Sequence, residues 1–185
     1  MDPERTLVDV PGEAEDRLRR LFTAYAPAVA NFLARRIEGD LDLDDLVDET
    51  FVIVWRRLDR VPPDFELPWI IGVARNVAHN ARRARQRRAH YERRFQGIGH
   101  QVAITPEDEV IADLAGRAAL DQLSRSDREL LRLHAWEGLE PREIAVVLGI
   151  TANAAATRLS RARKRFLVTL AAPPADGTDA PRPHI

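Results

Sequence analysis

Cysteine is absent from this sequence of 185 residues, and long apolar runs are absent as well. Without cysteine the chain can form no disulfide, no thiolate zinc site and no cysteine nucleophile. No apolar run approaches the roughly 20 residues that cross a bilayer. The first residues, MDPERTLVDV, also lack the basic-then-apolar order of a secretory signal. These absences predict a cytoplasmic protein that does not insert into membranes.

Signatures of catalysis are missing too. The chain has no glycine-rich phosphate-binding loop. Its five histidines are scattered without metal-ligand spacing, at His79, His90, His100, His134 and His184. The composition, 45% hydrophobic and 31% charged, is typical of a folded soluble protein. We therefore expect no enzymatic activity, no metal and no cofactor.

The net charge of −1 conceals an uneven charge distribution. Acidic residues gather in one segment, at Asp40, Asp42, Asp44, Asp45, Asp48 and Glu49. Basic residues gather in two others, residues 75–94 and 158–165, and Lys164 is the only lysine among 28 basic residues. One acidic patch and two basic patches indicate two kinds of partner. The alternative is that these charges are merely solvated helix faces.

Helical periodicity dominates, and no stretch shows sustained strand-like alternation. The pattern predicts helices over residues 13–38, 43–58 and 68–95, with Asp42 as an N-cap, and over residues 107–123, 127–136, 141–148 and 152–170. Ser126 and Glu129 have the spacing of a capping box. Paired prolines in RVPPDFELP separate the second helix from the third.

Two segments lack the helical pattern. Residues 96–106 contain two glycines and few apolar residues, and residues 171–185 are rich in proline and alanine. These compositions predict a flexible linker and a disordered tail. The predicted fold class is therefore all-α, with two small helical domains, residues 13–95 and 107–170, joined by the linker. The second would be a four-helix domain.

The last two helices of the second domain have the pattern of a helix-turn-helix, with Gly149 at the turn. At 100° per residue, the final helix buries a narrow stripe that comprises Ala155, Leu159, Ala162 and Phe166. Arginines 158, 161 and 165 form one flank, and the first turns carry small alanines. Such a helix suits insertion into a major groove, N-terminal end first. An ordinary amphipathic helix with a solvated basic face is the alternative.

The third predicted helix has a second basic face. Its apolar stripe is predicted to comprise Ile70, Val73, Val77, Ala81 and Ala84. Amides and arginines occupy the other side, and such side chains bind phosphates and base edges. Phe65 and Trp69 lie beside a proline-rich loop, where an aromatic group could contact an unpaired base. For Trp69 a place in the core is the favoured interpretation.

Taken together, three stretches resemble a known family. They are DLDDLVDETFVIVWRRLDRV, LPWIIGVARNVAHNARRARQRR and ALDQLSRSDRELLRLHAWEGLEPREIAVVLGITANAAATRLSRARKRF. Their order and spacing are similar to those of bacterial sigma factors of the extracytoplasmic-function (ECF) type, over about residues 14–170. The pairing of both motif blocks is specific, whereas the helix-turn-helix alone occurs in many regulators.

The resemblance implies partners and roles. Core RNA polymerase would bind Asp45, Leu46, Asp48, Glu49, Phe51 and Trp55, with Phe51 and Trp55 as exposed apolar anchors. The −10 promoter element would be read and melted by Phe65, Trp69, Arg75, Asn76, His79, Asn80, Arg82, Arg83 and Arg87, with residues 62–66 as the loop for an extruded base. The −35 duplex would contact Pro141, Arg142, Asn153, Thr157, Arg158, Ser160, Arg161 and Lys164. An anti-sigma factor, an inhibitory partner, is common in this family.

Three positions depart from the family pattern. Asp48 stands where an amide is usual, Ala155 where valine is common, and Ala156 where a basic residue is common. Two functions other than that of an alternative sigma factor stay open here. A conventional helix-turn-helix regulator would bind duplex sites alone and leaves the acidic segment unexplained. A protein-interaction module, such as a polymerase-binding anti-activator, would bind polymerase without selecting promoters.

Overall fold

The computed structural model describes residues 11–37, 41–95 and 114–171. In these ranges the chain forms helices and turns and no strand, which confirms the all-α prediction. The first group of helices is α1 (Pro11–Ala34), α2 (Leu43–Arg56) and α3 (Glu66–Phe95). The second is α4 (Leu114–Gln122), α5 (Arg125–Ala135), α6 (Pro141–Leu148) and α7 (Ala152–Ala171). The predicted linker and, apart from Ala171 at the end of α7, the predicted tail lie outside the described residues.

The first group is a three-helix arrangement in which each helix packs against the other two. Helical spacing places the largest apolar side chains inward, and Phe32, Leu33, Val54 and Ile70 are fully buried. Asp42 caps α2 as predicted, because its carboxylate accepts hydrogen bonds from the backbone N–H groups of Asp44 and Asp45 at 2.9 and 3.4 Å. Two short 3₁₀ turns, Leu58–Arg60 and Pro63–Phe65, connect α2 to α3.

In the second group, α6 and α7 form the predicted helix-turn-helix. Gly149 ends α6 with φ at 63°, in the left-handed region that glycine adopts without strain. The predicted capping box at Ser126 and Glu129 is wrong. Ser124 is the N-cap of α5, since its hydroxyl accepts from the backbone N–H of Asp127 at 3.1 Å, whereas Ser126 already lies inside the first turn. A capping box exists instead at Glu140 and Glu143, at the start of α6.

Replacing Gly149 with alanine should lower the free energy of unfolding by about 1–2 kcal/mol, because a Cβ disfavours the left-handed conformation. Urea titration of the two proteins measures this change. Gly116→Ala is the matched control, since Gly116 lies within α4 and an added Cβ there meets no atom within 4 Å. Equal stability of the Gly149→Ala variant and the parent protein would contradict the expected strain.

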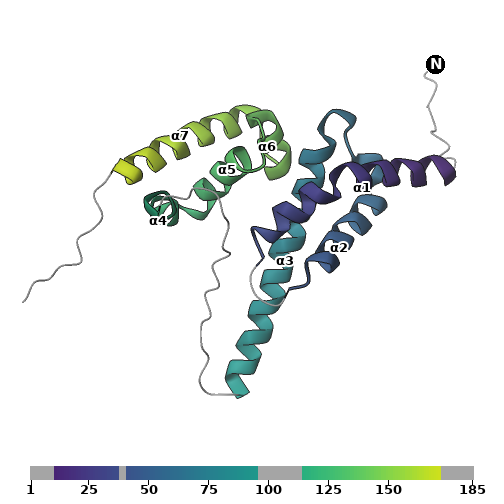
Figure 1. Ribbon diagram of the computed structural model, residues 1–185, viewed down its shortest axis with the longest axis horizontal. Helices are drawn as coiled ribbons and strands as arrows, with labels where there is room; N and C mark the ends of the chain where they lie inside the picture. Colours follow the sequence, from purple (N-terminus) through teal and green to yellow (C-terminus); the bar gives the residue numbers. More distant parts are fainter. Residues whose placement is uncertain (1–10, 38–40, 96–113, 172–185) are drawn as a thin grey trace, which may run out of the picture.

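The two groups of helices pack against each other, with α6 lying across α3 (Figure 1). Their buried residues form one continuous hydrophobic cluster, to which Ile70 and Ile71 contribute from α3 and Ile144 from α6. The two helices come into direct contact at Gly72. A Cβ on Gly72 would lie 3.4 Å from the carbonyl oxygen of Val147 and 3.5 Å from its Cα.

The C-terminal part of α3 extends away from both groups (Figure 1). This extension corrects the predicted apolar stripe of α3. Ile70, Val73 and Val77 are buried as expected, Ala81 is partly buried, and Ala84 is exposed. The helix outruns its neighbours, so no side chain of another helix is left to cover the last alanine of the stripe. Residues 83–88 of this projecting segment are exposed.

Candidate functional site

The acidic helix α2 presents one exposed face. Two of the predicted contact residues are not on it, because Leu46 and Phe51 are 6% and 5% exposed. The expectation that Phe51 is an exposed anchor is therefore wrong. Residues 47, 51, 54 and 58 recur at helical spacing and all point into the core. The Phe51 ring also packs edge-on against that of Phe22, with centroids 4.8 Å apart.

The exposed residues of this helix are mainly acidic and apolar, with the basic Arg56 at its last position. We call Asp45, Asp48, Glu49, Val52 and Trp55 the α2 face. Val52 and Trp55 are 46% and 42% exposed, which is high for large apolar side chains. Val52 was missed in the sequence, although its spacing of four from Asp48 and three from Trp55 places it on the same side. Apolar side chains rimmed by carboxylates are typical of a protein-binding surface with a basic partner.

Helix α3 carries five of the nine predicted −10 residues on its solvent side. The exposed ones, which we call the α3 face, are Asn76, His79, Asn80, Arg83 and Arg87. Arg82 is partly buried beside them. Amides and guanidinium groups on one exposed strip can hydrogen-bond base edges and neutralise phosphates.

The loop before α3 is fixed by polar contacts from α1. The Tyr25 hydroxyl donates to Glu66 at 3.0 Å, and the Arg17 guanidinium donates to the Val61 carbonyl at 2.7 Å. Burial raises the pKa of Tyr25, and the hydrogen bond to Glu66 adds to that rise, so the phenol stays protonated. Phe65, at the end of this loop, and Trp69, in the first turn of α3, are partly buried, and Trp69 packs against the core.

Helix α7 presents the other predicted set. Ala155, Leu159 and Ala162 are buried as predicted, and Phe166 is partly buried. The exposed members, which we call the α7 face, are Asn153, Thr157, Arg158, Ser160, Arg161 and Lys164. At the start of α6, Arg142 is exposed and Pro141 is partly buried. The first turns of α7 are narrow because alanine precedes the basic residues, so the helix can approach a surface closely.

Basic residues of the two helical groups meet in one hollow. Arg75 of α3 lines it together with Arg158, Arg161 and Arg165 of α7. Two carboxylates of α5 reach these arginines: Arg165 is 2.7 Å from Asp127, and Arg75 is 3.7 Å from Glu129. The structure therefore does not place Arg75 on the α3 face, since Arg75 is turned toward the second group of helices. Sequence spacing cannot reveal such pairs, which join residues far apart in the chain.

The described residues were also compared with the requirements of a membrane span and of a metal site, and meet neither. Among residues 11–37, 41–95 and 114–171, no helix is both long and apolar enough to cross a membrane. In the same part of the chain, no group of three or more histidine, aspartate or glutamate side chains is placed to hold a metal ion. The candidate binding surfaces are the acidic and apolar α2 face and the polar, basic α3 and α7 faces.

Known proteins are similar to this chain in sequence. The family model for Sigma-70 region 2 matches residues 21–88, and that for Sigma-70, region 4 matches residues 116–166. The chain is 31% identical to the RNA polymerase sigma factor CarQ of Myxococcus xanthus, over 83% of this chain and 88% of CarQ. It is 29% identical to the ECF RNA polymerase sigma factor EcfG of Rhodopseudomonas palustris, over 84% and 86% of the two chains.

Solved structures share the fold. The sigma factor RpoE of Bartonella quintana, solved in complex with the anti-sigma factor NepR, superposes with a TM-score of 0.57 at 22% identity, over 82% of this chain and 95% of that one. CnrH, solved with the cytosolic domain of CnrY, gives a TM-score of 0.52 at 24% identity, over 83% and 86%. With both region models matched in order and CarQ covered over most of its length, the chain belongs to the sigma-70 family, as an RNA polymerase sigma factor of the ECF type.

Proposed function

We propose that this sigma factor divides promoter-directed initiation among its three exposed faces. The α2 face binds core RNA polymerase, the α3 face captures and melts the −10 element, and the α7 face holds the −35 duplex. Strand opening is driven by the binding free energy of the unpaired bases, so the factor itself needs no catalytic group. Initiation takes place where core polymerase and the genome are, in the cytoplasm.

The observation that carries this assignment is that three different helices expose one acidic, partly apolar face and two polar, basic faces. The α2 face is acidic with two exposed apolar side chains, which suits a basic protein surface. The α3 and α7 faces bear amides, hydroxyls and arginines and no carboxylate, which suits nucleic acid. A conventional helix-turn-helix regulator would need only the α7 face. It gives no reason for exposed Val52 and Trp55 among carboxylates.

Reconstituted transcription tests the proposed function. Purified core polymerase is incubated with genomic fragments, with and without the full chain, and the 5′ ends of the transcripts are mapped. We expect discrete start sites that appear only when the chain is added, preceded by shared sequence elements near −10 and −35. Specific retention of duplex DNA by the chain alone, with no new start sites, would instead support the conventional regulator.

A further inference from the structure

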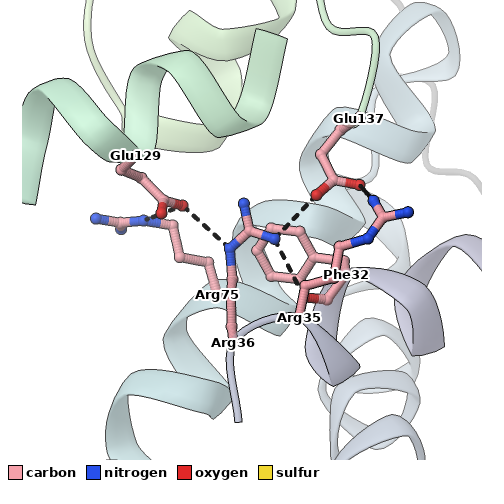
Figure 2. A network of polar contacts seen from close by, with 6 residues as sticks. All are labelled: Phe32, Arg35, Arg36, Arg75, Glu129 and Glu137. Atoms are coloured by element: carbon pink, nitrogen blue, oxygen red, sulfur yellow. Dashed lines mark hydrogen bonds and ion pairs between the residues drawn. The ribbon is translucent and has the colours of Figure 1, made fainter. Parts of the chain in front are cut away.

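Charged side chains at the boundary between the two helical groups have partners within the chain. Figure 2 shows the Arg36 guanidinium between Glu137 and Glu129, at 2.9 and 3.5 Å, with Arg75 also beside Glu129. Other charged side chains are exposed on α2 and α7. In the described part of the chain, those that take part in no ion pair include Asp45, Asp48, Arg161 and Lys164.

On α2 a line of exposed acids continues into exposed apolar side chains. Asp45, Asp48, Val52 and Trp55 are three, four and three residues apart, and this spacing places them along one side of the helix. The line is acidic in its N-terminal half and apolar in its C-terminal half. We call these four residues the α2 stripe.

The C-terminal half of α7 carries a line with the same spacing and the opposite charge. Arg161, Lys164, Val168 and Ala171 are all exposed and are again three, four and three residues apart. Val168 is 72% exposed, the highest value for a large apolar side chain in the described ranges. At 100° per residue the line lies opposite the buried side of α7. We call these four residues the α7 stripe.

The two stripes are complementary when their helices lie parallel. Both run over ten residues, about 15 Å of helix, with charge at the N-terminal end and apolar side chains at the C-terminal end. Spacings of three and four residues are also those by which two parallel helices interlock in a coiled coil. The residues that then face each other are Asp45 and Arg161, Asp48 and Lys164, Val52 and Val168, and Trp55 and the small Ala171.

Other pairings of the stripes are unfavourable. An antiparallel pair would place the carboxylates of α2 against the apolar end of α7. Two α2 stripes would oppose carboxylates, and two α7 stripes would oppose cations, so like charges exclude both symmetrical pairs. Figure 1 shows α2 and the end of α7 on opposite sides of the molecule, so in this arrangement one copy cannot bring its own stripes together. The partner that fits is a second copy of the chain.

We propose that this sigma factor self-associates head to tail, with the α2 stripe of one copy packed parallel against the α7 stripe of another. The two copies use different surfaces, so each pair leaves one stripe of each kind open for further copies. One helix against another buries a small area, so the association should be weak, with a Kd on the order of 100 μM.

The self-association does not depend on the proposed function, but it has a consequence for it. The α2 stripe lies within the α2 face, the proposed contact for core polymerase. A copy whose α2 stripe is covered by another copy is therefore unable to bind polymerase. Self-association and polymerase binding exclude each other, and the amount of competent factor rises less steeply than its total concentration.

Engineered cysteines test the register, because the chain itself contains none. Val52→Cys and Val168→Cys are made in separate full-length chains, of which one is isotopically labelled, and the mixture is oxidised. Residues that face each other in the parallel pair lie within the roughly 4.4–6.8 Å between Cα atoms that a disulfide spans. By mass spectrometry we expect the mixed disulfide to exceed each symmetrical one by about tenfold, because only the mixed pair avoids like charges.

Leu170→Cys is the matched control for Val168→Cys. Leu170 is also exposed near the end of α7, but at 100° per residue it lies about 160° around the helix from Val168. Val52→Cys should therefore form little disulfide with it. Equal cross-linking of Val52→Cys to both positions would overturn the register, and the absence of a mixed disulfide would overturn the contact.

An exchange of charges tests the same contact without oxidation, by sedimentation velocity of the full chain over a range of concentrations. Asp48→Lys alone and Lys164→Asp alone should each weaken self-association by about tenfold or more, because each variant opposes like charges. The chain with both substitutions restores opposite charges between copies and should associate like the parent protein. Weakening by both single variants without recovery in the double variant would overturn the pairing of Asp48 with Lys164.

The parent protein provides the simplest contrary result. If it stays monomeric at about 1 mM, roughly tenfold above the expected Kd, the self-association is wrong. Polymerase and promoter DNA are absent from both measurements. A failure of the proposed function would therefore be seen separately, in reconstituted transcription at sigma factor concentrations far below this Kd.

Discussion

Asp48→Arg combined with Trp55→Ala should abolish initiation from the start sites that depend on this sigma factor. Both side chains are exposed on the α2 face, so the fold should survive their replacement. Truncating an exposed aromatic anchor and reversing a rim charge should together cost about 4 kcal/mol. That is roughly a thousandfold increase in the Kd for core polymerase. The Kd is measured by fluorescence anisotropy of the labelled sigma factor, and start sites by transcript mapping.

Glu15→Arg is the matched control for the charge reversal, because Glu15 is an exposed acid on α1 and lies outside the α2 face. It should leave both the Kd and the start sites unchanged. A double variant that still binds core polymerase like the parent protein would show that the α2 face is not the polymerase contact. Mixed-sequence duplex binding should be unaffected, which separates loss of polymerase from general damage.

Asn80→Ala combined with Arg83→Ala should prevent opening of the −10 element while leaving polymerase binding intact. Both residues are exposed on the α3 face. Each contact with a base edge contributes about 1–3 kcal/mol. Their joint loss should therefore reduce open complexes by roughly a hundredfold, about 3 kcal/mol. Permanganate footprinting of unpaired thymines in the −10 region measures the opening directly.

A template with a mismatched bubble across the −10 element tests the role in melting. Mismatch removes the few kcal/mol needed to unpair and unstack a base, so the double variant should recover most of its activity on that template. Equal loss on duplex and bubble templates would contradict a role in melting and indicate a simple phosphate contact. Asn31→Ala with Arg20→Ala, an exposed amide and arginine on α1, is the control and should initiate normally.

Local signals in the sequence were sufficient for most of the helices. Asp42 caps α2 and Gly149 ends α6, because both act through backbone groups within a few residues of themselves. The N-cap of α5 was misplaced by two residues, since the run SRSD offers two serines and only the backbone geometry selects Ser124. Ala84 was placed in a buried stripe because periodicity does not show where neighbouring helices end.

The candidate site was less predictable than the helices. Family resemblance suggested Phe51 as an exposed anchor, but helical spacing alone groups it with buried Val47 and Val54. Resemblance assigns a role to a position, whereas burial depends on the neighbours that this chain supplies, here Phe22. The ion pair between Arg36 and Glu137 could not be predicted at all. Arg36 and Glu137 are separated by 101 residues, and each alone resembles an ordinary surface charge.

The pairing of Arg75 with Glu129 and of Arg165 with Asp127 has a consequence for ionic strength. Binding to DNA draws much of its free energy from the release of condensed counterions, in proportion to the phosphates that are newly neutralised. When an arginine leaves a carboxylate to bind a phosphate, the carboxylate becomes exposed to solvent. It then attracts cations of its own. The free sigma factor should thus release fewer ions on binding DNA than the number of its DNA-contacting arginines would suggest. Added salt weakens the arginine–carboxylate pairs and the arginine–phosphate contacts alike. It should therefore change the equilibrium between the two only slightly.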